Sequence, residues 1–262
     1  MGSGLAKSRN VTRRVIWTDT EGGVRGVPMW DITFIDEGRD GSRHALRLFR
    51  LADVHKAGRA RLRKYIPLSV YMKAMKTGSV YAAEYTLSKD GVWGDGEYRP
   101  IDMDMKAAVG AYLKERKGCV LCAWNMKAHD RHVLNRLVGN EIVSDMVLWD
   151  ALPWFRSKFT LPKNGLSSDK PGTPRHTFGV LTQGIAHSSL ADAAHLRELV
   201  LRAAYCLSLE GEVDTTASAG VTCGTMFDAA CAQIQDQVRE DEWVPVPRCA
   251  WGHNVPAAVY KA

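Results

Sequence analysis

Short runs of apolar residues, separated by Gly-containing turns, mark the first fifty positions. The runs cover 14–19, 27–35 and 43–50, and they are rich in β-branched and aromatic side chains. Such residues favour extended backbone, and turns of this length join antiparallel neighbours. The pattern therefore predicts a three-stranded antiparallel meander.

Helical and strand-like patterns alternate further along the chain. Residues 56–77 are helical in composition with a break at Pro67, and 79–87 end at a turn without a clear preference of their own. Apolar residues recur at helical spacing over 103–116, whereas 119–124 form the continuous apolar run typical of a strand covered on both faces. We predict a helix that leads into a central strand.

The second half continues this alternation. Its pattern predicts a helix over 128–138, a strand over 142–149, a long amphipathic helix over 188–207 and a shorter helix over 224–238. Three strands followed by helix, strand, helix, strand and helix indicate an α/β domain with a mixed sheet, in which the first three strands are antiparallel.

Three segments follow from these patterns. Residues 1–12 are expected to be a flexible N-terminus or a remnant of cloning, 13–207 the α/β domain, and 208–262 a C-terminal extension packed on or beside it. The chain has 262 residues, of which 45% are hydrophobic, so it can bury a sizeable core.

Composition narrows the cellular context. The formal net charge of +6 favours a polyanionic partner without specifying one. Six cysteines are too dilute for a disulfide framework, and no charged-then-apolar signal segment opens the chain. No apolar run approaches the roughly 20 residues of a membrane helix. We therefore expect an intracellular protein, cytoplasmic or nuclear, without a membrane partner.

Two carboxylates stand one residue apart at the end of the first apolar run. In a strand over 15–21, Asp19 and Glu21 point to the same face, where they repel each other unless a cation lies between them. Magnesium prefers such hard oxygen ligands and leaves room for substrate phosphates. An isolated D-x-E pair is more often a solvated pair at a strand end.

Other polar residues of similar chemistry stand at the ends of further predicted helices and strands. Asn125 follows the central strand, and Asp130 stands in the first turn of the next helix. His187 precedes Asp192 by five residues, at the start of the long helix. Helix N-termini favour carboxylates and phosphates, so a fold of this class can bring these side chains into one cleft.

These motifs together resemble those of the DEDDh (DnaQ-like) 3′-to-5′ exonuclease superfamily, which has a ribonuclease H-like fold. "VIWTDTEG" matches the first motif, and "MWDITFI" is similar to its second strand. "AWNMKAHD" matches the second motif, with Trp124 where a His is usual and with the longer, TREX-like spacing. "HSSLADA" matches the third motif, and Ser188 stands where a sister group has Tyr.

The resemblance implies a two-metal nuclease that releases nucleoside 5′-monophosphates. Asp19, Glu21, Asp130 and Asp192 would be ligands of two Mg²⁺ or Mn²⁺ ions. His187 would be the general base that takes the proton from the attacking water, a role suited to its ordinary pKa near 6.5. Without the spacing to Asp192, a hydrogen-bonded loop histidine would be the better interpretation.

Further residues are candidates for contact with the nucleic acid. Gly22 and Gly23 lack side chains, so the 3′ end of a strand can approach closely there. Trp124 and Asn125 can stack on and hydrogen-bond the terminal nucleotide, although a Trp at a strand end is more often core.

A basic stretch offers a second contact region. Between Arg39 and Lys64 the chain has nine Lys or Arg and two acids. This stretch can follow a phosphate backbone or form an ordinary solvated face. The candidates are Arg59, Arg61 and Arg63.

The cysteines favour packing over metal binding. Cys119 and Cys122 are an odd number of residues apart in a strand, which places them on opposite faces of the core. Cys223, Cys231, Cys249 and His253 have the chemistry of zinc ligands, but their irregular spacing disfavours a structural zinc site.

Three alternatives stay open at this point. The protein can be an RNA-specific enzyme of the same fold, either an RNA-trimming enzyme or a nuclease of double-stranded RNA like some viral relatives with a D-x-E-G first motif. It can be a binding module that keeps the fold without catalysis, or a metal-independent DNA-binding protein. The pattern leaves open DNA or RNA, single or double strands, and the oligomeric state.

Overall fold

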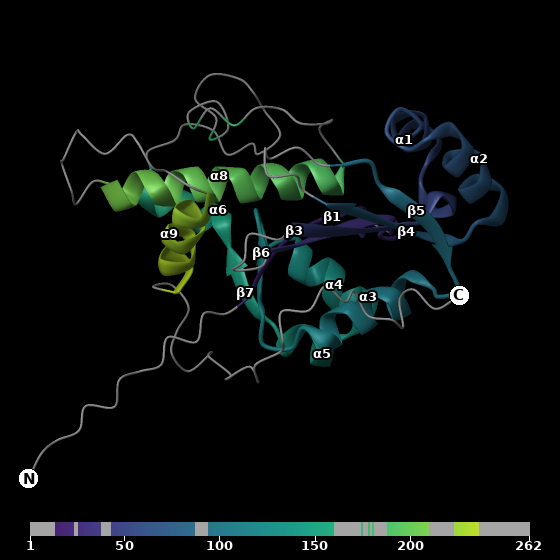
Figure 1. Ribbon diagram of the computed structural model, residues 1–262. Helices are drawn as coiled ribbons and strands as arrows, with labels where there is room; N and C mark the ends of the chain where they lie inside the picture. The colour runs from purple at the N-terminus through teal and green to yellow at the C-terminus, as the bar shows by residue number, and fades with distance from the viewer. Residues whose placement is uncertain are drawn as a thin grey trace, which may run out of the picture.

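A computed structural model describes residues 14–23, 26–37, 43–86, 94–159, 174, 178, 180, 188–209 and 223–235. These residues form one mixed seven-stranded sheet with helices on both faces (Figure 1). The strands are β1 (Val15–Glu21), β2 (Asp31–Glu37), β3 (Arg43–Phe49), β4 (Val80–Thr86), β5 (Glu97–Ile101), β6 (Val120–Ala123) and β7 (Val147–Asp150). The predicted α/β class with a mixed sheet is confirmed.

Strand order across the sheet is β5-β4-β3-β2-β1-β6-β7. From β5 to β1 each strand is antiparallel to its neighbour, whereas β6 runs parallel to β1 and β7 parallel to β6. The meander predicted for the first three strands is therefore confirmed. Parallel β6 and β7 are short and fully apolar in their middle, as strands covered on both faces are.

Helices fill the connections between these strands. They are η1 (Leu51–Asp53), α1 (Lys56–Leu62), α2 (Leu68–Thr77), α3 (Met105–Glu115), α4 (Asp130–Val138), α5 (Asn140–Ser144), α6 (Ala151–Lys158), α8 (Ser189–Leu209) and α9 (Cys223–Gln235). Pro67 separates α1 from α2, as predicted. In Figure 1, α8 lies along one face of the sheet and α3, α4 and α5 lie along the other.

Strand pairing defines two ends of the sheet. Glu21 pairs with Asp31, and Asp31 pairs with Phe49. The last residues of parallel β6 and β7, Ala123 and Asp150, pair with each other and lie toward the same end. We call this the site end, and we call the other one, where Asp36 and Glu37 finish β2, the opposite end.

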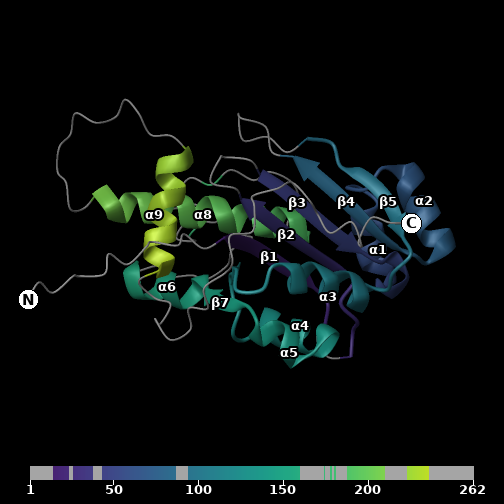
Figure 2. The same cartoon turned by 60° about the horizontal axis from the view of Figure 1, so that its bottom comes forward.

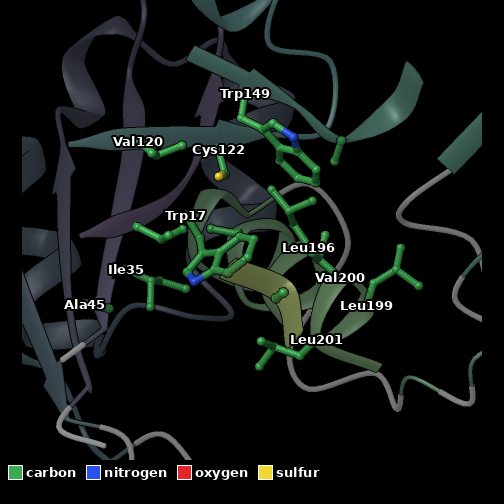
Figure 3. Close-up of a cluster of buried hydrophobic side chains, with 14 of the residues drawn as sticks. Trp17, Ile35, Ala45, Val120, Cys122, Trp149, Leu196, Leu199, Val200 and Leu201 are labelled. Atoms are coloured by element: carbon green, nitrogen blue, oxygen red, sulfur yellow. The ribbon is translucent and has the colours of Figure 1, made fainter. Parts of the chain in front are cut away.

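Each face of the sheet has its own apolar core. Toward α8, the core joins Trp17, Ile35 and Trp149 to Leu196 and Val200 (Figure 3). Toward α3 and α4, a second core contains inward-facing residues of the same strands, which are buried against helix residues. The alternation of side chains along β1 thus sends odd-numbered residues toward α8 and even-numbered ones away from it.

Polar contacts fix α8 on the sheet at two points. The Ser189 hydroxyl lies 2.7 Å from that of Thr33, and the Ser189 amide donates to Asp31 over 3.3 Å. Eight residues further along α8, Arg197 donates to Glu37 through Nε at 2.7 Å. Because Asp31 and Glu37 begin and end β2, the helix follows this strand from the site end toward the opposite end.

The region after residue 207 contributes to the same core. Phe227, Ala230, Cys231 and Ile234 of α9 are buried against α8, which α9 crosses in Figure 2. At least this part of the predicted C-terminal extension therefore packs on the domain.

One local expectation differs from the structure, and two elements were not predicted. The run 142–149 is not one strand, because α5 occupies Asn140–Ser144 and only Val147–Asp150 is extended. An apolar run fits a buried helical turn as well as a strand. The sequence pattern also gave no sign of α6 or of β5, an exposed edge strand that contains Pro100.

Candidate metal centre

Strand alternation places the two acids of β1 on the face covered by α8. Asp19 and Glu21 continue the parity of Trp17, which is buried in the α8-side core. Both acids are half-buried at the site end, next to the carboxyl ends of parallel β6 and β7. Ligand sites in mixed and parallel sheets commonly lie beyond such strand ends.

Asp192 joins them from the other side of this layer. It stands in the first turn of α8 and is buried with 5% of its surface exposed. Its amide donates to the Ser188 carbonyl over 2.9 Å, and Ser189 binds β2 as described above. The contacts of Ser189 with β2 therefore hold the first turn of α8 on the sheet, and this turn places Asp192 next to β1.

The three carboxylates meet closely enough to share a cation. One oxygen each from Asp19, Glu21 and Asp192 lies within 4.8 Å of the others. Oxygens on opposite sides of a magnesium ion are about 4.2 Å apart, twice the usual bond length. Acidic clusters on exposed surfaces are common without a metal, but this cluster is half-buried to buried, where like charges repel more strongly. The cluster can hold a metal ion.

The electrostatics of Asp19 reflect this crowding. Burial raises the pKa of its carboxyl well above the usual value, and the nearby carboxylates of Asp130, Asp192, Glu21 and Asp31 raise the pKa further. No salt bridge of Asp19 is present within the described part of the chain. The ionised carboxylate of Asp19 is therefore unfavourable here unless a cation lies beside it. Without a cation, the raised pKa favours the protonated, neutral carboxyl.

Asp130 is placed beside this cluster and is not one of its three members. The carboxylate begins α4, is buried, and accepts a hydrogen bond from the Thr20 hydroxyl at 2.7 Å. Burial raises the pKa of Asp130, and the Thr20 hydrogen bond opposes this rise. Of the four predicted ligands, three thus converge directly, while Asp130 adds charge from the other side of β1.

A buried ion pair between β2 and β3 lies near the acid cluster. Asp31 of β2 is fully buried and accepts two hydrogen bonds of 2.8 Å from Arg47 of β3, in the fork geometry that suits a carboxylate. Asp31 also accepts from the Ser189 amide. The sequence motif marked an acid at this position, but nothing in the pattern indicated Arg47 as its partner.

His195 is a second residue that sequence reasoning missed. It is 2% exposed, and its Nδ1 lies 3.8 Å from an Asp192 oxygen, one turn along α8. Neither ring nitrogen has a hydrogen-bond partner among the described residues. The imidazole therefore packs beside a candidate ligand and limits the directions in which that carboxylate can turn.

The predicted general base and nucleotide contacts have different outcomes. His187 lies outside the described residues, so its role stays a prediction. Trp124 is half-buried and packs on Phe155 with ring centroids 5.4 Å apart, which supports the core interpretation of this tryptophan. Asn125 is half-buried in the turn after β6, where its carbonyl accepts from the His129 amide.

The glycine pair after β1 has an internal explanation. Gly22 and Gly23 have positive φ angles of 86° and 76°. A Cβ atom on Gly22 would lie 2.4 Å from the Pro28 carbonyl oxygen, and one on Gly23 would lie 2.5 Å from Val133. Backbone conformation and packing within the chain therefore account for both glycines, without the approach of a 3′ end that the sequence suggested.

The three candidate arginines of the basic stretch also differ. Arg59 donates to the backbone carbonyls of Val54 and Ala52, so its guanidinium holds the corner between η1 and α1. These two hydrogen bonds give Arg59 a structural role, and its assignment to substrate binding stays a prediction. Arg63 is exposed, and the side chain of Arg61 lies outside the described part.

The cysteines of the central strand pack as predicted. Cys119 belongs to the core toward α3, and Cys122 belongs to the core toward α8. Burial raises the pKa of the Cys122 thiol, and the nearby Cys231 raises it further. Cys249 and His253 of the disfavoured zinc set lie outside the described residues.

Comparisons with protein-family models, with curated proteins and with solved structures found no match. No helix in the described segments is both long and apolar enough to cross a membrane.

Proposed function

We propose that the protein is a metal-dependent 3′-to-5′ exonuclease with a ribonuclease H-like fold. The observation that carries this proposal is the meeting of Asp19, Glu21 and Asp192, from β1 and α8, around a position that a cation can occupy. The mixed sheet with three antiparallel first strands and helices on both faces supports the fold assignment. The order of the three sequence motifs supports the choice of a nuclease.

The residues fit two Mg²⁺ or Mn²⁺ ions in number and chemistry. Asp19, Glu21 and Asp192 would hold the first ion, and Asp130 would add its carboxylate after giving up or sharing the Thr20 hydrogen bond. When bound, these ions would neutralise the phosphate and lower the pKa of a water molecule. The chain itself supplies an anchored first turn of α8 and a rigid β1, which fix the ligands.

The proposed reaction is hydrolysis of the last phosphodiester bond. A water oxygen forms a bond to phosphorus, while the bond from phosphorus to the 3′ oxygen of the preceding nucleotide breaks. One proton of the water goes to His187, and the released 3′ oxygen takes up a proton from solvent. The products are a nucleoside 5′-monophosphate and a strand shortened by one nucleotide.

Digestion of 5′-labelled strands tests the proposal. DNA and RNA substrates, single and double stranded, are incubated with Mg²⁺, with Mn²⁺ or with chelator. A ladder that shortens from the 3′ end only with metal supports the exonuclease, and the preferred strand identifies its substrate. The Glu141→Gln variant, which changes an exposed acid of α5, serves as a matched control for Asp192→Asn.

Two results would contradict the proposal. Wild-type protein that binds nucleic acid but releases no nucleotide with either metal would indicate a binding module. Unchanged digestion by Asp192→Asn would show that the acid cluster is not the catalytic centre. Digestion of RNA alone would support the RNA-specific form of the enzyme.

A further inference from the structure

Helices α1 and α2 form most of the connection between β3 and β4, and the charged side chains from residue 54 to β4 are all basic. Residues 54–83 contain seven Lys or Arg and no Asp or Glu. We call residues 54–79, with α1 and α2, the basic insertion. The proposed chemistry of the acid cluster does not use it.

The basic insertion lies at the site end of the sheet. It follows η1, which comes directly after β3, and it leads into β4 at Val80. Phe49, the last residue of β3, pairs with Asp31, the partner of Glu21. The pairing thus connects the acid cluster and the start of the insertion along one row of neighbouring strands. In Figure 1, α1 and α2 lie beyond the end of α8 that carries Asp192.

The insertion also lies on the same face as the cluster. Leu62, Ile66 and Ala74 are buried in the core that contains Trp17 and α8. Because Asp19 and Glu21 share the face of Trp17, cations and carboxylates lie on the same face at the same end of the sheet.

The cations of the insertion are available to a partner. The side chains of five are exposed: Lys56, Arg63, Lys64, Lys73 and Lys76. Within the described residues, none of the five forms a salt bridge, whereas Arg59 is bound to backbone carbonyls. On α2, Lys73 and Lys76 occupy the exposed face that also carries Leu68 and Met72, which are 54% and 59% exposed.

We propose that the basic insertion binds the phosphate backbone of the nucleic acid several nucleotides away from the cleaved bond, so that long strands bind more tightly than short ones. This inference rests on the proposed function, because it takes the acid cluster as the position of the 3′ end. Lysines and arginines that neutralise phosphates release condensed counterions, which is the main source of sequence-independent affinity.

Strand spacing gives the length at which the effect begins. Three spacings of about 4.8 Å separate β1 from β4, so the end of the insertion, where α2 leads into β4, lies roughly 14 Å from β1. Phosphates of one duplex strand follow each other at about 3.4 Å, so roughly four nucleotides span this distance. Strands shorter than this reach the acid cluster without reaching α2.

A nucleic acid fits this face better than an anionic membrane does. The cations lie at the same end and on the same face of the sheet as a cluster of carboxylates, which a flat layer of anionic headgroups would meet at the same time. A single polymer strand can follow the cations and present only its end to the cluster. The apolar surface of α2 consists of two exposed side chains on a helix of 10 residues, which is little for membrane insertion.

Equilibrium binding in chelator tests the inference without cleavage. Fluorescence anisotropy is measured with 5′-labelled strands of about 25 and about 2 nucleotides, which lie above and below the expected threshold. The variants are Lys73→Gln with Lys76→Gln, and Arg63→Gln with Lys64→Gln. The control is Lys114→Gln with Lys117→Gln, which removes the same charge from exposed positions near the end of α3, at the opposite end of the sheet.

The insertion variants should bind the long strand about tenfold more weakly and the short strand with unchanged affinity. For the long strand, the slope of log affinity against log salt concentration should become smaller by about one to two. The control pair should bind both strands like wild type. Unchanged long-strand binding by both insertion variants, or equal loss with the control pair, overturns the inference. So does loss of binding to vesicles of phosphatidylserine without loss of binding to nucleic acid.

These outcomes are separate from those of the proposed function. Cleavage does not occur in chelator, so a protein that proves inactive with metal still reports whether the insertion holds the long strand. Conversely, an active nuclease whose insertion variants bind every strand normally would keep the proposed function and lose this inference. Thermal unfolding of each variant verifies that the exposed substitutions leave the fold intact.

Discussion

The two ends of the β1–β2 pair both carry buried acids, and they neutralise them in different ways. At the opposite end, Asp36 accepts from Arg14 and from Arg116, the latter at 3.2 Å. Glu37 lies 3.0 Å from Arg43 and also binds Arg197. Asp36 and Glu37 thus both have arginines from neighbouring parts of the chain beside them.

At the site end, Asp31 follows this scheme through Arg47. The neighbours that raise the pKa of Asp19 are other carboxylates. An arginine of the same chain neutralises a buried acid, so that the acid stabilises the fold. Neighbouring carboxylates cannot neutralise each other, so they favour the binding of a cation from solution. The comparison therefore distinguishes acids that hold the fold from acids that can hold a ligand.

Asp19→Asn should produce the largest effect. The amide removes charge from the cluster with little change in shape, so metal-dependent hydrolysis should fall by about 10³-fold. Stability in chelator should stay equal or rise, because a repelled, buried charge is gone. Activity assays with Mg²⁺ and thermal unfolding in chelator measure both quantities. A destabilised variant would mean that Asp19 belongs to the scaffold, like the acids of the opposite end.

Asp36→Asn should show the reverse pattern. It takes from Arg116, which is 6% exposed, its buried acidic partner and leaves only the more exposed Glu115 at 3.8 Å, and breaking such a buried pair costs about 3–5 kcal/mol of unfolding free energy. The folded fraction should keep wild-type metal affinity. Urea unfolding and calorimetric titration with Mn²⁺ measure the two effects. Lost metal affinity at full stability would remove the distinction between the two ends.

Thr20→Val should have a smaller effect on stability. The Asp130 carboxylate loses the hydroxyl that donates to it, so about 1–2 kcal/mol of unfolding free energy should be lost in chelator. The pKa of Asp130 should rise further. If Asp130 becomes a metal ligand, saturating Mn²⁺ should recover most of this loss in urea unfolding. Failure of Mn²⁺ to do so would place Asp130 with the scaffold acids.

The smallest effect should appear in the pH dependence of stability. The folded pKa of Asp19 lies above its unfolded value of about 3.9, so the folded state binds more protons between these two values. In chelator, the contribution of Asp19 therefore falls as the pH rises through this window, and Asp19→Asn should lack it. Urea unfolding of both proteins at several pH values measures the difference. Parallel curves would contradict the raised pKa.

The sequence predicted those parts of the fold that depend on local periodicity. Alternation along β1 was sufficient to put Asp19 and Glu21 on one face, and the helical period was sufficient to place Asp192 at the start of α8. The prediction of a strand over 142–149 was wrong in its first half, because a short apolar segment does not show whether its period is that of a strand or of a helix.

Partners from distant elements could not be predicted in the same way. Thr20 and Asp130 are 110 residues apart, and Arg197 and Glu37 are 160 residues apart. Many arginines could pair with Glu37, and only the packing of α8 along β2 selects Arg197. The same applies to Gly22 and Gly23, whose neighbours Pro28 and Val133 become known only from the fold.

The two attachment points of α8 also determine where the chain can change in length. Ser189 and Arg197 both bind β2, with Asp192 between them. One inserted residue between them would rotate the rest of the helix by about 100° and shift it by about 1.5 Å. Asp192 and Arg197 could then not both reach their strands. Relatives that keep this site should therefore vary in length before Ser188 or beyond α8, and they should keep the spacing from Ser189 to Arg197 constant.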